Sequence, residues 1–183
     1  TLFRSDAVQD AMKGKDSVEI EGGTFTLNAG EDGIQASNDE EEDKGYVKIS
    51  DGTFSITAAA KGIKAETLLE VTGGTIDIDS EDDAVHCNGD VNITGGTFTI
   101  ATGDDGIHAD NQVVIDDGTI TIIESYEGIE GLTIDINGGV IDVTSEDDGL
   151  NAAGGNDGSG NLESGMEGRP GGPGGTLDRK SVV

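Results

Sequence analysis

Pairs of acidic residues recur in this sequence at one fixed place, directly before a glycine or an alanine. The clearest pairs are Asp82-Asp83 and Asp104-Asp105, which lie 22 residues apart. Calcium binds six to eight oxygens at about 2.3–2.6 Å and takes carboxylates readily. These pairs are therefore the leading candidates for binding calcium (Ca2+). Less complete copies of the series add further candidate ligands: Glu31, Asp32, Glu127, Asp147 and Asp148.

Lys61 stands where the second copy of the series would have an acid, next to the position of Asp83, and Lys64 is nearby. A lysine beside calcium-binding carboxylates is what a calcium-assisted pectate lyase needs, because the metal acidifies a proton that the lysine removes. A salt bridge at the end of the acidic series explains the same residue with less coincidence. Lys61 is thus a catalytic candidate only under an alternative hypothesis, and the main hypothesis has no catalytic residue.

His86 and His108 occupy one position of the repeat, three residues after the second acid of each pair. Stacked histidines beside carboxylates could hold a transition metal or contact a sugar. An ordinary polar, outward strand position explains them as well. We take His86, His108, Lys64 and Tyr126 as candidate carbohydrate contacts.

A repeat of 22 residues positions these side chains. One column of the aligned repeats contains Gly23, Gly52, Gly74, Gly96, Gly118 and Gly139. A second column, of glycine or alanine, follows each of these glycines by ten residues. Within a repeat, apolar residues alternate with polar ones in three short bursts, as in Val91 and Ile93, Phe98 and Ile100, and Ile107 and Ala109. Repeats this short must stack to bury a core. The pattern predicts an all-β, right-handed parallel β-helix of about six coils with three short strands each.

Stacking would bring the acidic pairs together along one edge, because neighbouring coils lie about 4.8 Å apart. Like charges about 5 Å apart repel by roughly 3 kcal/mol at an effective dielectric near 20, so a cation is expected between them. Solvated turn aspartates that only aid solubility are the alternative.

The formal net charge of −28 excludes nucleic acid and anionic membrane surfaces as natural partners, since phosphate would be repelled. A single cysteine, Cys87, rules out an internal disulfide framework, and no apolar run is long enough to cross a bilayer.

Both ends of the chain differ from the repeat. Residues 1–5 (TLFRS) and 178–183 (DRKSVV) match the two translations of a common sequencing adapter, so we expect them to be artefacts of a metagenomic fragment. The repeats cover residues 6–152. We expect Asp6-Ala7-Val8 to match Asp83-Ala84-Val85, in the last third of a preceding coil. Residues 153–177 are Gly-rich and without period, which predicts a flexible loop or linker.

The repeated V-x-I-x-G-G-T-F-T-I followed by D-D-G-I-x-A resembles a bacterial, clostridial-type β-helix carbohydrate-binding domain family. The resemblance implies a polysaccharide-lyase-like fold, bound calcium, and binding of cellulose or pectic acid at the cell surface. We therefore expect a calcium-binding, non-catalytic, extracellular or surface-attached domain whose partner is a plant-type or other extracellular polysaccharide. The alternatives are the pectate-lyase-like enzyme and a repeat adhesin or spacer.

Overall fold

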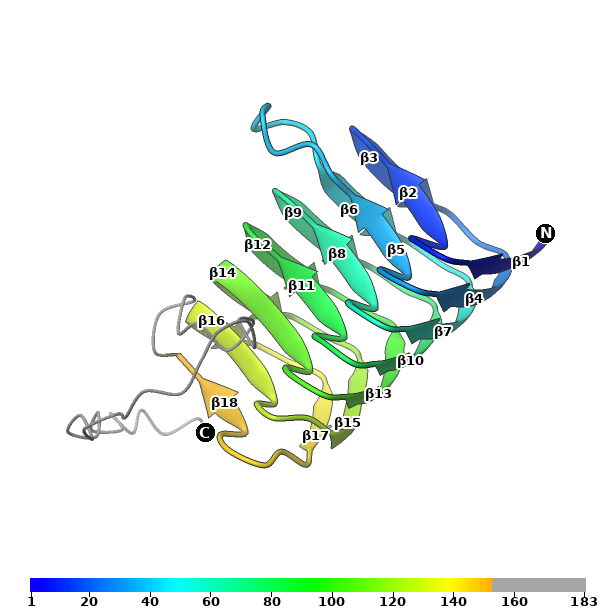
Figure 1. The fold of residues 1–183 in the computed structure, drawn as a ribbon. Helices are drawn as coiled ribbons and strands as arrows, with labels where there is room; N and C mark the ends of the chain where they lie inside the picture. Colours follow the sequence, from blue (N-terminus) through cyan, green and yellow to red (C-terminus); the bar gives the residue numbers. More distant parts are fainter. Residues whose placement is uncertain (153–183) are drawn as a thin grey trace, which may run out of the picture.

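The computed structural model describes residues 1–152, which form a parallel β-solenoid of stacked coils (Figure 1). The predicted linker at 153–177 and the predicted adapter segment at 178–183 lie outside the described residues. Within residues 1–152 the chain contains no helix that could cross a membrane. The predicted fold class, a parallel β-helix with short strands, is confirmed.

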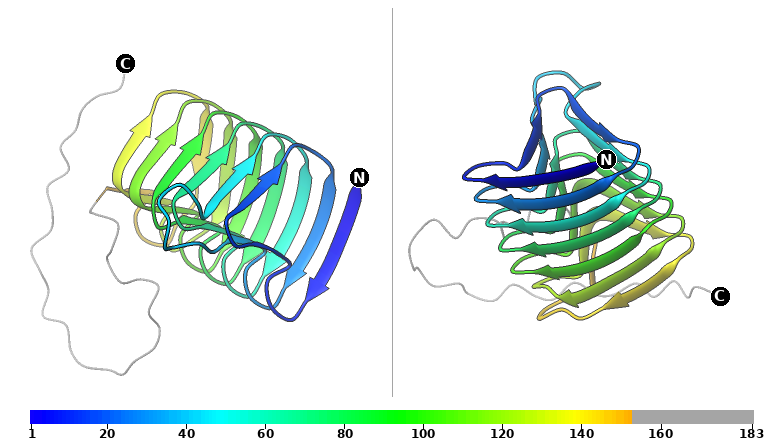
Figure 2. Two further views of the ribbon diagram at one scale, coloured as in Figure 1. Left: turned by 90° about the horizontal axis from the view of Figure 1, so that it is seen from above. Right: turned by 90° about the vertical axis from the view of Figure 1, so that its right-hand side faces the viewer.

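One face of the solenoid is a parallel sheet of seven strands, one from each coil (Figure 2). Neighbouring strands pair in register, so Thr75 lies opposite Thr53 on one side and Thr97 on the other. The strands of this sheet, in spatial order, are β1 (Leu2–Ala7), β4 (Thr24–Ala29), β7 (Thr53–Ala58), β10 (Thr75–Ser80), β13 (Thr97–Thr102), β15 (Thr119–Glu124) and β17 (Val140–Val143).

The other strands form a second sheet that wraps around the remaining two faces. One face follows the acidic turns and contains β2 (Met12–Gly14), β5 (Ile34–Ala36), β8 (Ile63–Ala65), β11 (Val85–Cys87) and β18 (Leu150–Asn151). The other contains β3 (Ser17–Ile20), β6 (Tyr46–Ile49), β9 (Leu68–Val71) and β12 (Asp90–Ile93). Two longer strands, β14 (Ile107–Ile115) and β16 (Ile129–Ile136), run through both faces.

The bore is filled by the alternating apolar residues, because every second side chain of a strand points to the same side. Val91, Ile93, Phe98, Ile100 and Ile107 are all 0% exposed. Phe25 and Phe54 stack with ring centroids 4.7 Å apart. Cys87 lies in the inward column with Ala65 and Ala109, where burial raises the pKa of its thiol to about 12. The predicted core is therefore confirmed.

A glycine directly precedes the strands β7, β10, β13 and β15 of the seven-stranded sheet, where the backbone turns into the strand. Gly52, Gly74, Gly96 and Gly118 have φ between 100° and 132°, a region that side chains disfavour.

The acidic insertion at 37–44, which interrupts the 22-residue repeat, forms a loop between β5 and β6. The buried side-chain amide of Asn38 donates to Asp16 and accepts from the backbone N–H groups of Glu40 and Glu41. The insertion is thus accommodated outside the core.

The first coil begins differently from our expectation. Strand β1 pairs with β4, which adds a seventh strand to the sheet and places Asp6 opposite Asn28. Met12 pairs with Ile34, so Asp10-Ala11-Met12 takes the place of Asp83-Ala84-Val85, and the alignment through Asp6-Ala7-Val8 is wrong. Residues 2–5 lie within β1, and their adapter origin stays a prediction.

Candidate functional site

The position of the second acid of each pair forms a column along the turns that lead into β2, β5, β8, β11, β14, β16 and β18, and one member of this column is a lysine. We call it the turn column, and it contains Asp10, Asp32, Lys61, Asp83, Asp105, Glu127 and Asp148. The backbone of the next coil fixes several of its carboxylates: Asp83 Oδ1 accepts from the N–H of Asp105 at 3.1 Å, and Asp32 Oδ1 accepts from that of Lys61 at 3.0 Å. Side-chain direction at these turns is therefore set by the stacking itself.

Asp10 is a member that the sequence analysis missed. Its Oδ1 accepts from the N–H of Asp32 at 3.1 Å, and Lys13 lies 2.9 Å from its Oδ2. The available signal was its position, 22 residues before Asp32 and directly before an alanine, as Asp83 is.

The structure brings three of the predicted calcium ligands together at the third and fourth coils. Asp82, Asp83 and Asp104 each offer a carboxylate oxygen, and these oxygens lie within 4.8 Å of one another. Burial and the charges of Asp83, Asp105 and Asp82 raise the pKa of Asp104 to about 7. A raised pKa beside two other carboxylates shows that negative charge exceeds positive charge at this place. We call this group the acid trio.

Lys61 lies against the acid trio from the coil below. Its Nζ is 2.7 Å from Asp82 Oδ2 and 3.0 Å from Asp83 Oδ2. Burial alone would lower the pKa of Lys61, but the charge of Asp83 and the hydrogen bond to Asp82 outweigh it, so that the pKa is raised. The amine is therefore held protonated in an ion pair.

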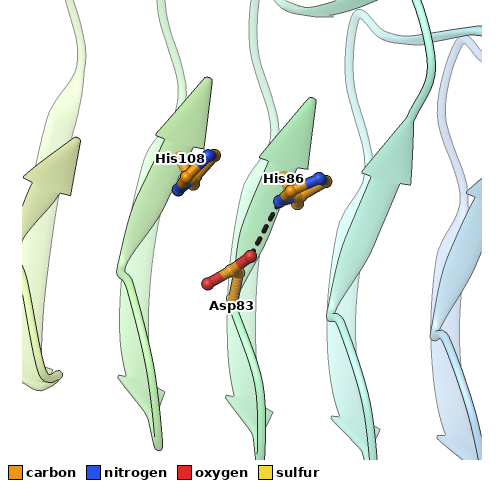
Figure 3. A group of neighbouring side chains, drawn as sticks. All are labelled: Asp83, His86 and His108. Atoms are coloured by element: carbon orange, nitrogen blue, oxygen red, sulfur yellow. Dashed lines mark hydrogen bonds and ion pairs between the residues drawn. The ribbon is translucent and has the colours of Figure 1, made fainter. Parts of the chain in front are cut away.

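Asp83 also connects to the histidines. Its Oδ2 is 2.7 Å from His86 Nδ1, and the rings of His86 and His108 stack at 4.9 Å on the neighbouring strands β11 and β14 (Figure 3). Burial raises the pKa of Asp83, but the hydrogen bond with His86 and the charge of Lys61 outweigh it and lower that pKa to about 2. Asp83 is thus ionised at neutral pH, where Asp104 still holds part of its proton.

Asp105, the fourth leading candidate, belongs to a different group. It is 0% exposed, and its Oδ2 lies 3.0 Å from His108 Nδ1. Glu130 is also 0% exposed, and its Oε2 lies 3.0 Å from the same nitrogen. Glu130 occupies an outward strand position opposite His108, so its sequence position alone does not mark it as a metal ligand.

The remaining predicted calcium ligands are spread along the solenoid. Asp32 is buried and accepts from Gln35, while Glu127 is buried and accepts from Asn151. Glu31, Asp147 and Asp148 are exposed. None of these five belongs to the groups of three metal-binding side chains found among residues 1–152.

The predicted carbohydrate contacts differ in their access to solvent. Tyr126 is 41% exposed, while the side chain of Lys64 is 24% exposed and lies 3.4 Å from Glu66. The side chains of His86 and His108 are only 13% and 10% exposed. Lys64 and Tyr126 are therefore the members most accessible to a ligand at the surface, and His86 presents only an edge of its ring to solvent.

Fold and site together define a β-solenoid binding module with an acidic, histidine-containing edge. A family model described as "carbohydrate-binding domain-containing protein" matches residues 2–128 and, in a second overlapping segment, residues 78–168. The chain belongs to this carbohydrate-binding domain family. The comparisons with curated proteins and with solved structures gave no match.

Proposed function

We propose that this chain is a calcium-binding, non-catalytic domain that binds cellulose or a pectic, uronate-containing polysaccharide, on a bacterial protein that is secreted or held at the cell surface. Membership of the carbohydrate-binding domain family supports the polysaccharide partner. The observation that carries the calcium proposal is the acid trio, because Asp82, Asp83 and Asp104 converge within 4.8 Å.

Calcium suits the acid trio better than a proton or the lysine alone. Three carboxylates face the single ammonium of Lys61, which reaches Asp82 and Asp83. A divalent ion would neutralise the remaining charge, take carboxylate oxygens from two coils, and complete its shell with backbone carbonyls and water. Calcium would therefore tie the third coil to the fourth.

The same ion explains how an acidic domain could bind an acidic polymer. At a net charge of −28, direct binding of a uronate chain would be opposed by repulsion. A calcium ion with part of its shell open can bridge protein carboxylates and uronate carboxylates, because the bound cation is then the largest local charge. Lys64, His86 and Tyr126 would contact the sugar beside it.

A pull-down on insoluble polygalacturonate and on cellulose, with calcium and with a chelator, tests this proposal. We expect retention on polygalacturonate with calcium and release when the chelator is added. Asp104→Asn, which removes one ligand of the acid trio, should lose this retention. Asp147→Asn is its matched control, since Asp147 occupies the same position of the repeat but is exposed and outside the acid trio.

Two results would contradict the proposal. Retention that is indifferent to the chelator would exclude the calcium bridge. Stabilisation by calcium without retention on any polysaccharide of a glycan array would instead identify the solenoid as a spacer or adhesin repeat.

The lyase alternative is less well supported by the geometry of Lys61. A general base must be deprotonated to accept a proton, yet the carboxylates of Asp83 and Asp82 raise the pKa of this lysine and occupy its ammonium. We therefore treat Lys61 as a structural counter-ion of the acid trio.

This assignment predicts that the protein forms no unsaturated uronide from polygalacturonate, even with calcium at alkaline pH. The ultraviolet absorbance of the product is the measurement, and Lys61→Gln should match the parent at background level. Lys48→Gln serves as the control for loss of a lysine, because Lys48 pairs with Glu70 on another face and is not a proposed sugar contact. Product formation by the parent that disappears only in Lys61→Gln would restore the enzyme hypothesis.

A further inference from the structure

The coil next to His108 departs from a pattern that four other coils of the solenoid share. In several coils, the residue three positions after the turn column donates to that column: Lys13 to Asp10, Gln35 to Asp32, and His86 or His108 to its aspartate. The fifth coil has Glu130 at this place, directly opposite His108. An ionised glutamate cannot donate a hydrogen bond. The fifth coil thus adds a buried acid where its neighbours supply a donor.

The resulting group holds two acids for one imidazole. Asp105 and Glu130 are both 0% exposed, and one imidazole nitrogen, His108 Nδ1, lies 3.0 Å from an oxygen of each. Two carboxylates thus face one imidazole nitrogen, and buried charge is costly unless it is balanced.

A second observation is independent of this charge count. Asp105 Oδ1 is fully buried and has no hydrogen-bond partner among residues 1–152, whereas the equivalent oxygen of Asp83 accepts from the backbone of the next coil. Buried carboxylate oxygens in native structures are normally satisfied by protein, water or an ion. The Asp105 carboxylate thus has capacity for a ligand.

We propose that Asp105, His108 and Glu130 form a binding site for a divalent transition metal ion of the zinc type. The three residues offer one nitrogen and two carboxylate oxygens within 4.8 Å of one another. Ligands bound to zinc at about 2.0–2.2 Å in a tetrahedron lie roughly 3.3–3.6 Å apart, so the 3.0 Å separations need only a small expansion.

The surroundings of His108 match what such a metal requires. Its other ring nitrogen, Nε2, lies 3.2 Å from Asp110 Oδ1, which fixes the ring with Nδ1 directed at Asp105 and Glu130. Metal-binding histidines commonly bond their second nitrogen to a carboxylate in this way. An imidazole ligand favours zinc-type ions over calcium, which prefers oxygen alone. The site shares no residue with the acid trio, and it does not depend on the proposed function.

Cobalt(II) absorption and zinc titration calorimetry on the folded protein, purified without a histidine tag and freed of metal by a chelator, test this site. We expect one equivalent of Zn2+ to bind, the cobalt(II) spectrum of a nitrogen and oxygen site, and no displacement by excess calcium. Cys87 does not compete, since it is buried in the bore and its thiol pKa is about 12.

Glu130→Gln is the main variant, because Gln35 shows that glutamine fits this position of the repeat. It should weaken zinc by more than about 100-fold, beyond the 10–100-fold expected when only an outer partner is lost. Asp110→Asn, which leaves the three ligands in place, should weaken zinc by that smaller factor. His86→Gln is the matched control and should bind zinc like the parent.

Several outcomes would overturn the proposal. They are no zinc binding by the parent, unchanged affinity in Glu130→Gln with circular dichroism that shows a folded protein, or displacement of cobalt by calcium. Loss of zinc in His86→Gln would move the ion to the neighbouring group of Asp83, His86 and His108, which also contradicts the assignment. Polygalacturonate binding is measured separately, so failure here leaves the calcium proposal intact.

Discussion

Replacing Asp104 by asparagine is expected to have opposite effects with and without calcium. Burial and the neighbouring acids raise the pKa of Asp104 to about 7, well above the 3.8 of an unfolded aspartate. The folded state therefore holds this proton more tightly than the unfolded state, and stability is lost as the pH rises from about 4 through 7. At pH 8 in a chelator, Asp104→Asn should thus melt at a higher temperature than the parent.

With calcium present, the order should reverse. An ion at a thousand times its dissociation constant stabilises the protein by about 4 kcal/mol. For a domain of this size, each kcal/mol raises the melting temperature by roughly 2–4 °C. Asp104→Asn lacks one ligand of the acid trio and should lose most of that increase. Differential scanning calorimetry with calcium and with chelator measures both effects in one series.

Two companion variants sharpen the test. Asp147→Asn should show the calcium response of the parent, because it is exposed and outside the acid trio. Lys61→Gln should tighten calcium binding, since it removes an ammonium that lies 2.7 Å and 3.0 Å from Asp82 and Asp83. Equal calcium responses in the parent and in Asp104→Asn would place the ion elsewhere.

Much of the fold follows from the repeat alone. The period of 22 residues places Val91, Phe98 and Ile107 in three inward columns, and all three are 0% exposed. A parallel stack keeps one register from coil to coil, so a column in the alignment becomes a column in space. The first coil was misaligned because Lys13-Gly14 resembles the later strands less than Asp6-Ala7-Val8 resembles Asp83-Ala84-Val85.

The grouping of the acids was harder to predict. The alignment shows that Asp83 and Asp105 share a column, but the structure assigns one to the acid trio and the other to the group with His108 and Glu130. Both aspartates contact the histidine three residues later. The division depends instead on their other neighbours, which are Asp82 and Asp104 for Asp83, and Glu130 for the group of Asp105, and a single column does not encode these neighbours. The sequence does not single out Glu130, because outward strand positions are usually exposed. Glu130 is nevertheless buried, with His108 and Asn151 of the two adjacent coils on either side of it.

The stability of the metal-free protein should fall as the pH rises from 7.5 to 9.5, and His108 should be the cause. Burial lowers the pKa of His108, but the hydrogen bond to Asp105 and the charges of Asp83 and Glu130 outweigh it and raise that pKa to about 9. The folded pKa exceeds the unfolded value of 6.5. The stabilisation is therefore fully present below pH 6.5 and is lost as the pH rises through 9.

Chelator-treated protein is the right sample for this measurement, because a metal ion would displace the proton at His108 Nδ1. The window above pH 7.5 also avoids most of the titration of Asp104, whose pKa is about 7. The expected loss is roughly 2 kcal/mol across the window, since one pH unit of such linkage is worth about 1.4 kcal/mol. That corresponds to about 4–8 °C in melting temperature.

His108→Gln should abolish this slope. Glutamine does not titrate, and Gln35 shows that its amide can bond the turn column, at 2.9 Å from Asp32 Oδ2. His86→Gln keeps His108 and should retain the slope of the parent. A His108→Gln protein whose melting temperature still falls by the same amount between pH 7.5 and 9.5 would show that another group carries the proton. The charge of Asp105 and Glu130 would then have to be balanced in some other way, because His108 is the cation that the structure places between them.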